Sequence, residues 1–222
     1  MPPEDCARPI PTRYAAANIR RPGGICNFQD HLTTRWHDGG VRDLALTKWS
    51  LEMLAAEELR AASPPRQPLT VSHVEIPSPE FSRFLYTAVG GQWYWLARLG
   101  WSCADWERHL DRPEVETWVA YVGGTPAGYF ELEAHRGDGT IEIAQLGLLP
   151  SFIGLGLGGH LVTVAVKRAW AIGATRVVVH TFSLDHPNAL SNYRARGFRV
   201  FDEFTGPARV PDEPPGAWPG AT

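Results

Sequence analysis

The chain has 222 residues, a formal net charge of −3 and 20% charged residues, which is ordinary for a globular protein. This length suits one domain with an appendage better than two full domains. The sequence has no basic tail and no lysine or arginine stripe, so we do not expect nucleic acid as a partner.

The sequence also bears on location and redox state. Its N-terminus, MPPEDCARPIP, is unlike a signal peptide, and no apolar run reaches membrane-spanning length. We therefore expect a cytoplasmic protein that does not associate with membranes. Cys6, Cys26 and Cys103 are an odd set without CxxC spacing, which predicts reduced cysteines and no metal site.

The N-terminal part of the chain is weakly patterned. Residues 1–43 carry repeated prolines and no sustained periodicity, so we expect an irregular extension there. Residues 44–54 are predicted to form a first strand, and residues 55–68 a polar connector or short helix that ends at prolines. A second strand is expected over residues 69–76, although its alternation of apolar and polar residues is poor.

An aromatic segment follows Pro77 and is expected to form two helices. Ser78, which precedes a proline and a glutamate, predicts the first helix start. Ser102 followed by Asp105 resembles a capping box and predicts the second. The connector between them holds a cluster of rings that includes Trp93 and Trp95.

The rest of the chain alternates strands and helices. Residues 116–122 and 127–134 predict an antiparallel hairpin about the turn GGTP. Residues 141–201 then read strand, Gly-rich turn, helix, strand, Asn-containing turn, helix and strand, and the crossover helices imply locally parallel pairing. The segment after residue 206 is rich in proline and glycine and is expected to be irregular.

The Gly-rich turn lies in IEIAQLGLLPSFIGLGLGGHLV, just before a helical pattern that begins near Gly158. Glycines let backbone amides approach a ligand closely, and the helix N-terminus adds partial positive charge. The combination favours a phosphate-bearing ligand. On the same helix, His160, Thr163 and Lys167 are spaced by three and four and predict a narrow solvent-facing stripe.

Two motifs together resemble the GCN5-related N-acetyltransferase (GNAT) superfamily. The loop pattern of that family, Arg or Gln followed by spaced glycines, is matched by Gly154 and Gly156 but not by Ile153. The second pattern is matched farther along by Asn188, Ala189, Leu190, Tyr193, Gly197 and Phe198. A Rossmann loop also uses spaced glycines, but it does not explain this pair of motifs.

The resemblance implies an α+β (α/β) GNAT fold, with a mixed central sheet of about six to seven strands flanked by about four helices. The acetyltransferase domain would span residues 44–205, between an irregular N-terminal extension (1–43) and an irregular C-terminal tail (206–222). A homodimer is possible, because the last strand could pair across an interface. Acetyl-CoA would be the co-substrate, held by Leu146, Gly147, Leu148, Gly154, Leu155, Gly156, Leu157, Gly158, Gly159 and Asn188.

The resemblance also implies two catalytic residues. Tyr193 lies at the general-acid position of the family, where a phenol can protonate the departing thiolate; alternatively, it is a packing residue. Glu142 lies where some members, including the histone acetyltransferases, carry a general base; alternatively, it is a strand residue facing solvent. Asn188 could instead be a helix cap.

Four further residues are weaker candidates for the acceptor site: Trp93, Trp95, Glu131 and His180. The rings could bind an amine or simply pack the helices on the sheet. His180, Glu131 and Glu133 are alternative bases, and an interior histidine is as compatible with the pattern of His180 as a catalytic one. Asp185 and His186 are read as a structural pair near a helix start.

The function that we expect is transfer of acetyl from acetyl-CoA to a primary amine of a small molecule, by direct attack in a ternary complex. Two alternatives stay open within the fold. One is acetylation of a peptide or protein, and the other is a module that senses CoA without turnover, for which Ile153 is the sequence support.

Overall fold

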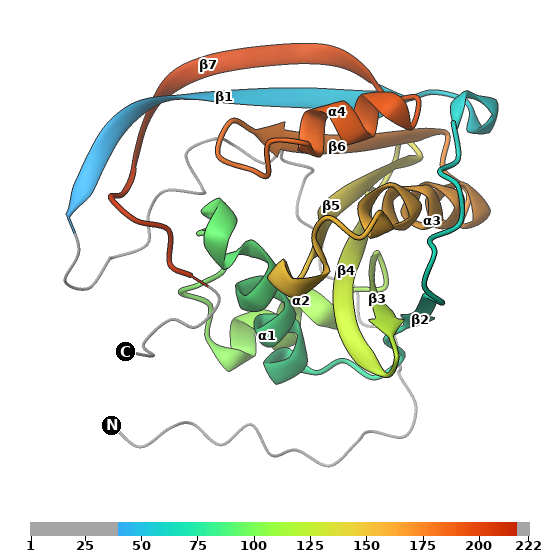
Figure 1. The fold of residues 1–222 in the computed structure, drawn as a ribbon, viewed down its shortest axis with the longest axis horizontal. Coiled ribbons are helices and arrows are strands. Elements are labelled where there is room, and N and C mark those ends of the chain that lie inside the picture. Colours follow the sequence, from blue (N-terminus) through green and yellow to red (C-terminus); the bar gives the residue numbers. More distant parts are fainter. Residues whose placement is uncertain (1–39, 217–222) are drawn as a thin grey trace.

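The computed structural model describes residues 40–216 (Figure 1). The predicted N-terminal extension therefore lies almost wholly outside the described residues, as do Cys6 and Cys26. Among the described residues, no helix combines the length and the apolar character that crossing a membrane requires.

One seven-stranded mixed sheet forms the centre of the fold, in the order β2-β3-β4-β5-β6-β1-β7. Only the neighbours β5 and β6 pair in parallel, and the other neighbouring pairs are antiparallel. This arrangement confirms the predicted mixed sheet and its local parallel pairing. The strands are β1 (Val41–Met53), β2 (Thr70–His73), β3 (Val115–Val122), β4 (Thr125–Ala134), β5 (Thr140–Leu148), β6 (Arg176–Phe182) and β7 (Arg199–Pro211).

Four α-helices flank this sheet: α1 (Pro79–Gly90), α2 (Cys103–Leu110), α3 (Leu157–Ala171) and α4 (Ala189–Ala195). Two of their starts confirm the sequence prediction. The Ser78 hydroxyl accepts a hydrogen bond from the backbone N–H of Phe81, and Ser102 forms a reciprocal capping box with Asp105. Short 3-10 turns lie at Ala56–Glu58, Gly91–Trp93 and Pro150–Phe152.

The helices cover both faces of the sheet, and each face has its own core (Figure 1). Neighbouring strand residues point to opposite faces, so Phe130 packs in the core under α3 while Tyr129 packs with α1. Helix α3 contributes an apolar stripe to the larger core, and Thr163 is buried within it. The predicted solvent stripe is therefore wrong at Thr163.

The outer strands β1 and β7 are longer than predicted. They pair antiparallel from Val41↔Pro211 to Glu52↔Arg199 and reach beyond the rest of the sheet (Figure 1). Residues 41–43 and 206–211 are thus in strands rather than irregular. The backbone pairing between the two strands orders both segments, which propensity alone does not predict.

The reduced state predicted for the cysteines is wrong for Cys103, which is disulfide-bonded. Disulfides are uncommon in cytoplasmic proteins, so this bond does not favour the predicted cytoplasmic location. That location stays a prediction.

A buried ion cluster joins the helical connector to the sheet. The guanidinium of Arg98 donates to both carboxylate oxygens of Glu131, at 3.0 and 2.8 Å, and His109 Nε2 lies 3.0 Å from Glu131 Oε1. Burial raises the pKa of Glu131, but the Arg98 charge and the hydrogen bonds from His109 and Arg98 outweigh it and lower the pKa to about 2. This carboxylate is therefore ionised at neutral pH and fully paired.

We predict that Glu131→Ala lowers the free energy of unfolding by about 3–5 kcal/mol, because it leaves the buried Arg98 charge without a partner. Glu133→Ala is the control, since Glu133 is on the same strand and pairs with the more exposed Arg112; its loss should be about 1 kcal/mol or less. Urea denaturation at pH 7 measures both. Equal losses would show that the buried cluster contributes no more than a surface pair.

Candidate active site

An opening in the sheet defines the site. The parallel pairing of β5 with β6 ends at Ile143↔Val179, while β5 continues to Leu148 and keeps its pairing with β4. The backbone of residues 144–148 therefore has a strand partner on one side only. A strand edge of this kind can accept main-chain hydrogen bonds from an extended ligand.

Two local features accompany this divergence. Leu132 pairs with Ile143 and Glu131 with Gln145, so Ala144 is an extra residue on β5 that makes a bulge, and bulges bend a strand. Three residues farther on, a Cβ at Gly147 would lie 2.4 Å from Val89 Cγ1 and 3.7 Å from Trp95 Cη2. The first distance is too short for a real contact, so only glycine lets Val89 of α1 approach the strand this closely, whereas the distance to Trp95 is an ordinary contact.

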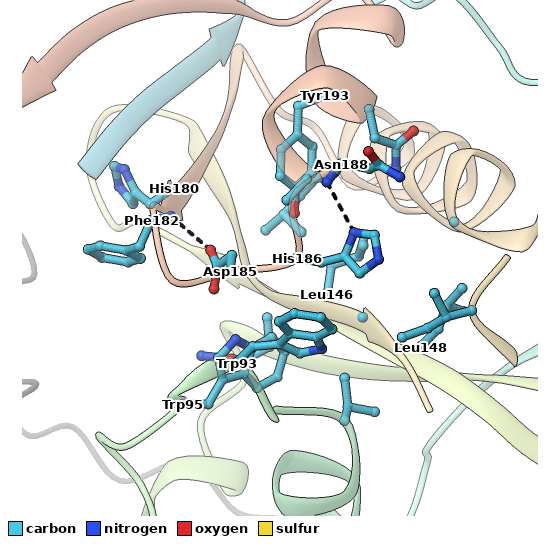
Figure 2. A pocket seen from close by; sticks show the side chains of 18 of the residues that line it. Trp93, Trp95, Leu146, Leu148, His180, Phe182, Asp185, His186, Asn188 and Tyr193 are labelled. Atoms are coloured by element: carbon cyan, nitrogen blue, oxygen red, sulfur yellow. Dashed lines mark hydrogen bonds between the residues drawn. The ribbon is translucent and has the colours of Figure 1, made fainter. Parts of the chain in front are cut away.

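A cavity of about 1940 Å³ fills the opening. Figure 2 shows Tyr193 of α4 and Asn188, the residue before this helix, on one side of it, with Trp93 and Trp95 on the opposite side. The predicted site residues that line this cavity are Trp93, Trp95, Glu142, Leu146, Gly147, Leu148, Gly154, Leu155, Gly156, Leu157, Gly158, Gly159, His180, Asn188 and Tyr193.

Glu131 is the exception among the predicted site residues. Its side chain is 2% exposed and lies within the ion cluster described above, whereas its partners Arg98 and His109 reach the cavity wall. Glu131 thus does not contact a ligand in this cavity directly. Sequence alternation alone could not distinguish it from Glu133, which does line the cavity.

The Gly-rich loop forms one end of the cavity. Gly154 and Gly156 have φ values of 86° and 77°, which side chains rarely adopt, and Gly156 is the N-cap residue of α3. No side chain caps this helix and its first turn holds no acidic residue, so its first backbone N–H groups face the cavity end without a competing anion. This geometry suits a phosphate group.

The phenol of Tyr193 is buried in the cavity wall. The Tyr193 ring packs edge-on against the ring of Phe198, with centroids 5.9 Å apart, and Tyr193 is 6% exposed. Burial, and secondarily the nearby Asp185 carboxylate, raise the pKa of Tyr193 well above its ordinary value. The hydroxyl therefore keeps its proton at neutral pH and can donate it.

The side chain of Asn188 does not cap α4. This residue is the N-cap residue of α4, but its side chain makes no capping hydrogen bond, and its backbone N–H donates to His186 Nδ1 at 3.1 Å (Figure 2). The Asn188 amide lines the cavity instead.

Asp185 has the structural role that the sequence suggested. It accepts hydrogen bonds from Thr181 Oγ1 and from the backbone N–H of Phe182, both at 2.8 Å, and so fixes the turn after β6. Burial raises the pKa of Asp185, against the lowering effect of these hydrogen bonds and one from Trp95.

Glu142 lies between two histidines. Its Oε2 is 3.0 Å from His135 Nε2 and its Oε1 is 3.8 Å from His180 Nε2, while His180 Nδ1 lies 3.1 Å from Ser50 Oγ. Burial raises the pKa of Glu142, but the His135 hydrogen bond and the charges of both histidines lower it overall. The carboxylate is ionised at neutral pH and holds both imidazoles at the cavity wall.

Sequence reasoning did not identify His135 or the outer strands as parts of the site. His135 follows β4 and Glu142 lies on β5. The short turn between these strands brings the two residues together, and it was the sequence signal that could have identified His135. Leu46, Lys48 and Val210 of β1 and β7 also line the cavity, which only the long pairing of these strands explains.

The outer strands are also linked to the aromatic connector. Tyr94 has a φ of 56°, which is uncommon for a residue other than glycine. Its hydroxyl accepts a hydrogen bond from Arg42 Nη2 at 3.0 Å and donates to the Asp212 carbonyl at 3.3 Å. These contacts fix the connector, and with it Trp93 and Trp95, beneath the strands.

Comparison with known proteins gives a consistent result. The model of the acetyltransferase (GNAT) family matches residues 79–198. A GCN5-related N-acetyltransferase from Kribbella flavida superposes with a TM-score of 0.54 at 18% identity, covering 78% of this chain and 60% of that one. Another, from Sphaerobacter thermophilus, gives 0.54 at 17% identity, covering 79% and 54%. This chain thus spans little more than half of these structures, and no protein with a curated description matches it.

The histidine pair generates a titration prediction. The Glu142 hydrogen bond raises the pKa of His135, so Glu142→Gln should lower this pKa, as followed by NMR of the imidazole. The stabilisation from His135 protonation is present below its unfolded pKa of about 6.5 and is lost as the pH rises through the folded value. Glu133→Gln is the control, because it removes the same charge without removing the hydrogen bond to His135. It should lower the pKa of His135 less than Glu142→Gln does. An unchanged His135 titration in Glu142→Gln would contradict the ion pair.

Proposed function

Since this chain belongs to the acetyltransferase (GNAT) family, we propose that it transfers acetyl from acetyl-CoA to the primary amine of a small molecule. The observation that carries the proposal is the single cavity that collects the glycine loop, the open edge of β5, Tyr193 and Glu142. The two motifs are far apart in sequence, and they meet at one site.

The residues at one end of the cavity suit acetyl-CoA, which supplies the activated thioester. The free N–H groups at the start of α3 would hold the pyrophosphate. The edge of β5 at residues 144–148 would pair with the amides of the pantetheine arm, as an added strand does. The side chains of Leu146 and Leu148 give this arm apolar walls, and Asn188 lines the same cavity from the side of α4 (Figure 2).

The reaction needs an acceptor for the proton of the ammonium group. The lowered pKa of Glu142 makes its carboxylate a weak base. We therefore assign this role to Glu142 and His180 together: the carboxylate attracts the ammonium, and the His180 imidazole, whose Nε2 lies 3.8 Å from Glu142 Oε1, accepts a proton when it is in its neutral form.

The backbone of β5 and the phenol of Tyr193, which both line the cavity, would serve the remaining steps. The free amine attacks the thioester carbonyl directly, and a backbone N–H of β5 stabilises the oxyanion that forms. When the C–S bond breaks, Tyr193 gives its proton to the thiolate. This role requires a protonated phenol, and the raised pKa of Tyr193 keeps it protonated at neutral pH without making it a stronger acid.

The test combines binding and turnover. We expect calorimetry to detect acetyl-CoA binding, and free-thiol release to detect turnover with at least one member of a panel of aminoglycosides, amino acids, polyamines and arylalkylamines. Folded protein that binds neither acetyl-CoA nor CoA would refute the proposal. Binding without turnover would favour a CoA sensor, and turnover with peptides alone would favour the peptide acetyltransferase.

Tyr193→Phe should lower kcat by about 10²-fold or more, since general acid catalysis contributes about 10²–10⁴-fold, while the affinity for acetyl-CoA changes little. Tyr121→Phe, on β3 and not among the residues that line the cavity, is the matched control. Steady-state kinetics and calorimetry separate the two quantities. An unchanged kcat in Tyr193→Phe would reassign this residue to packing.

A further inference from the structure

The side chain of Arg196 lies against the first turn of α3. Arg196 directly follows α4, and a Cβ placed on Gly159 would be 2.6 Å from its Nη1 atom. The same Cβ would be 3.4 Å from Asn192 Oδ1. Arg196 and Asn192 line the same cavity as residues 153–159 of the glycine loop.

Arg196 differs from the other half-buried and buried arginines among residues 40–216. Arg98, Arg112, Arg168 and Arg176 each form an ion pair with a glutamate. Within these residues, Arg196 has no ion pair, and its Nε is buried without a hydrogen-bond partner. Arg196 is only partly buried, but its charge has no anion beside it among these residues, and a charge-assisted hydrogen bond to an anionic ligand would supply one.

The surroundings of Arg196 add positive charge rather than neutralise it. The N-terminus of α3 carries the positive end of the helix dipole, and its first turn contains no acidic residue. The loop itself, residues 153–159, has no charged side chain and begins with the apolar Ile153. Any side-chain charge for a phosphate here must therefore come from another element.

Gly159 explains how the guanidinium reaches this place. Its φ is not in the left-handed region, so the backbone does not require glycine, and glycine within a helix costs about 1 kcal/mol relative to alanine. A side chain at this position would, however, occupy the space of Arg196 Nη1. Gly159 thus makes room for the guanidinium rather than for a turn.

Residues 60–62 fix the two elements relative to each other. The backbone N–H of Arg60 donates to the Arg196 carbonyl at 3.0 Å, and that of Ala62 donates to Thr163 Oγ1 at 3.0 Å. Thr163 in turn donates to the Gly159 carbonyl at 2.8 Å. The buried Thr163 therefore ties this connector to the turn of α3 that faces Arg196.

We propose that Arg196 binds the pyrophosphate of acetyl-CoA and supplies the cationic side chain that the loop lacks at Ile153. This inference rests on the proposed function, since it assigns a residue to the cofactor half of that site. It makes the end of α4, as well as the loop, a determinant of cofactor affinity.

The first test is the affinity for CoA, measured by calorimetry. Arg196→Gln should weaken binding by about tenfold to a hundredfold, the range for a hydrogen bond to a charged group. Arg194→Gln removes the same charge from an exposed position on α4 that does not line the cavity, and its affinity should stay within about twofold of the original. Arg196→Lys, which keeps the charge, should lose less than Arg196→Gln.

The second test locates the phosphate. Dephospho-CoA keeps the pyrophosphate but lacks the 3′-phosphate, so Arg196→Gln should weaken its binding as much as that of CoA. Acetylpantetheine has no phosphate, and its affinity should not change. If the loss disappears with dephospho-CoA, Arg196 contacts the 3′-phosphate and the pyrophosphate assignment is wrong.

The third test is rescue. Ile153→Arg, introduced into Arg196→Gln, should recover most of the lost affinity for CoA, because it returns a cation to the same end of the cavity. A general folding defect would not be rescued in this way, and thermal melts of each variant check for one. Unaltered CoA affinity in Arg196→Gln would overturn this inference alone, whereas an original protein that binds no CoA would overturn the proposed function with it.

Discussion

The end of the β5–β6 pairing at Ile143 and Val179 is the constraint on which the site depends. Beyond this point the two strands lead to different groups that line the cavity. Strand β5 offers its unpaired edge and leads into the glycine loop, whereas β6 leads through the Asp185 turn to α4. The cavity is therefore a consequence of backbone topology, and side chains set which ligand it accepts.

The opposite wall is rigid for a different reason. Arg98, Glu131 and His109 form a buried ion cluster that joins the helical connector and α2 to β4. The close approach of Val89 to Gly147 adds a steric contact between α1 and β5. Glu131, which the sequence suggested as a substrate-binding residue, thus has a structural role. Its partners Arg98 and His109 are the residues that line the cavity.

Local signals in the sequence predicted much of this structure, and long-range pairings account for what they missed. Ser78, Ser102 and the glycines of the loop act through their own backbone or that of near neighbours, so pattern alone locates them. The extent of β1 and β7, and the burial of Thr163, depend on partners far along the chain. The same holds for Arg196, whose relation to Gly159 no spacing rule describes.

Hydrogen exchange with and without acetyl-CoA tests the central claim most directly, because it reports on the backbone that the ligand is proposed to occupy. The account predicts slower exchange of amides in residues 144–148 and 154–159 on binding, with little change in the β2–β3 pair at the far edge of the sheet. Binding of acetyl-CoA that leaves exchange in both segments unchanged would contradict it.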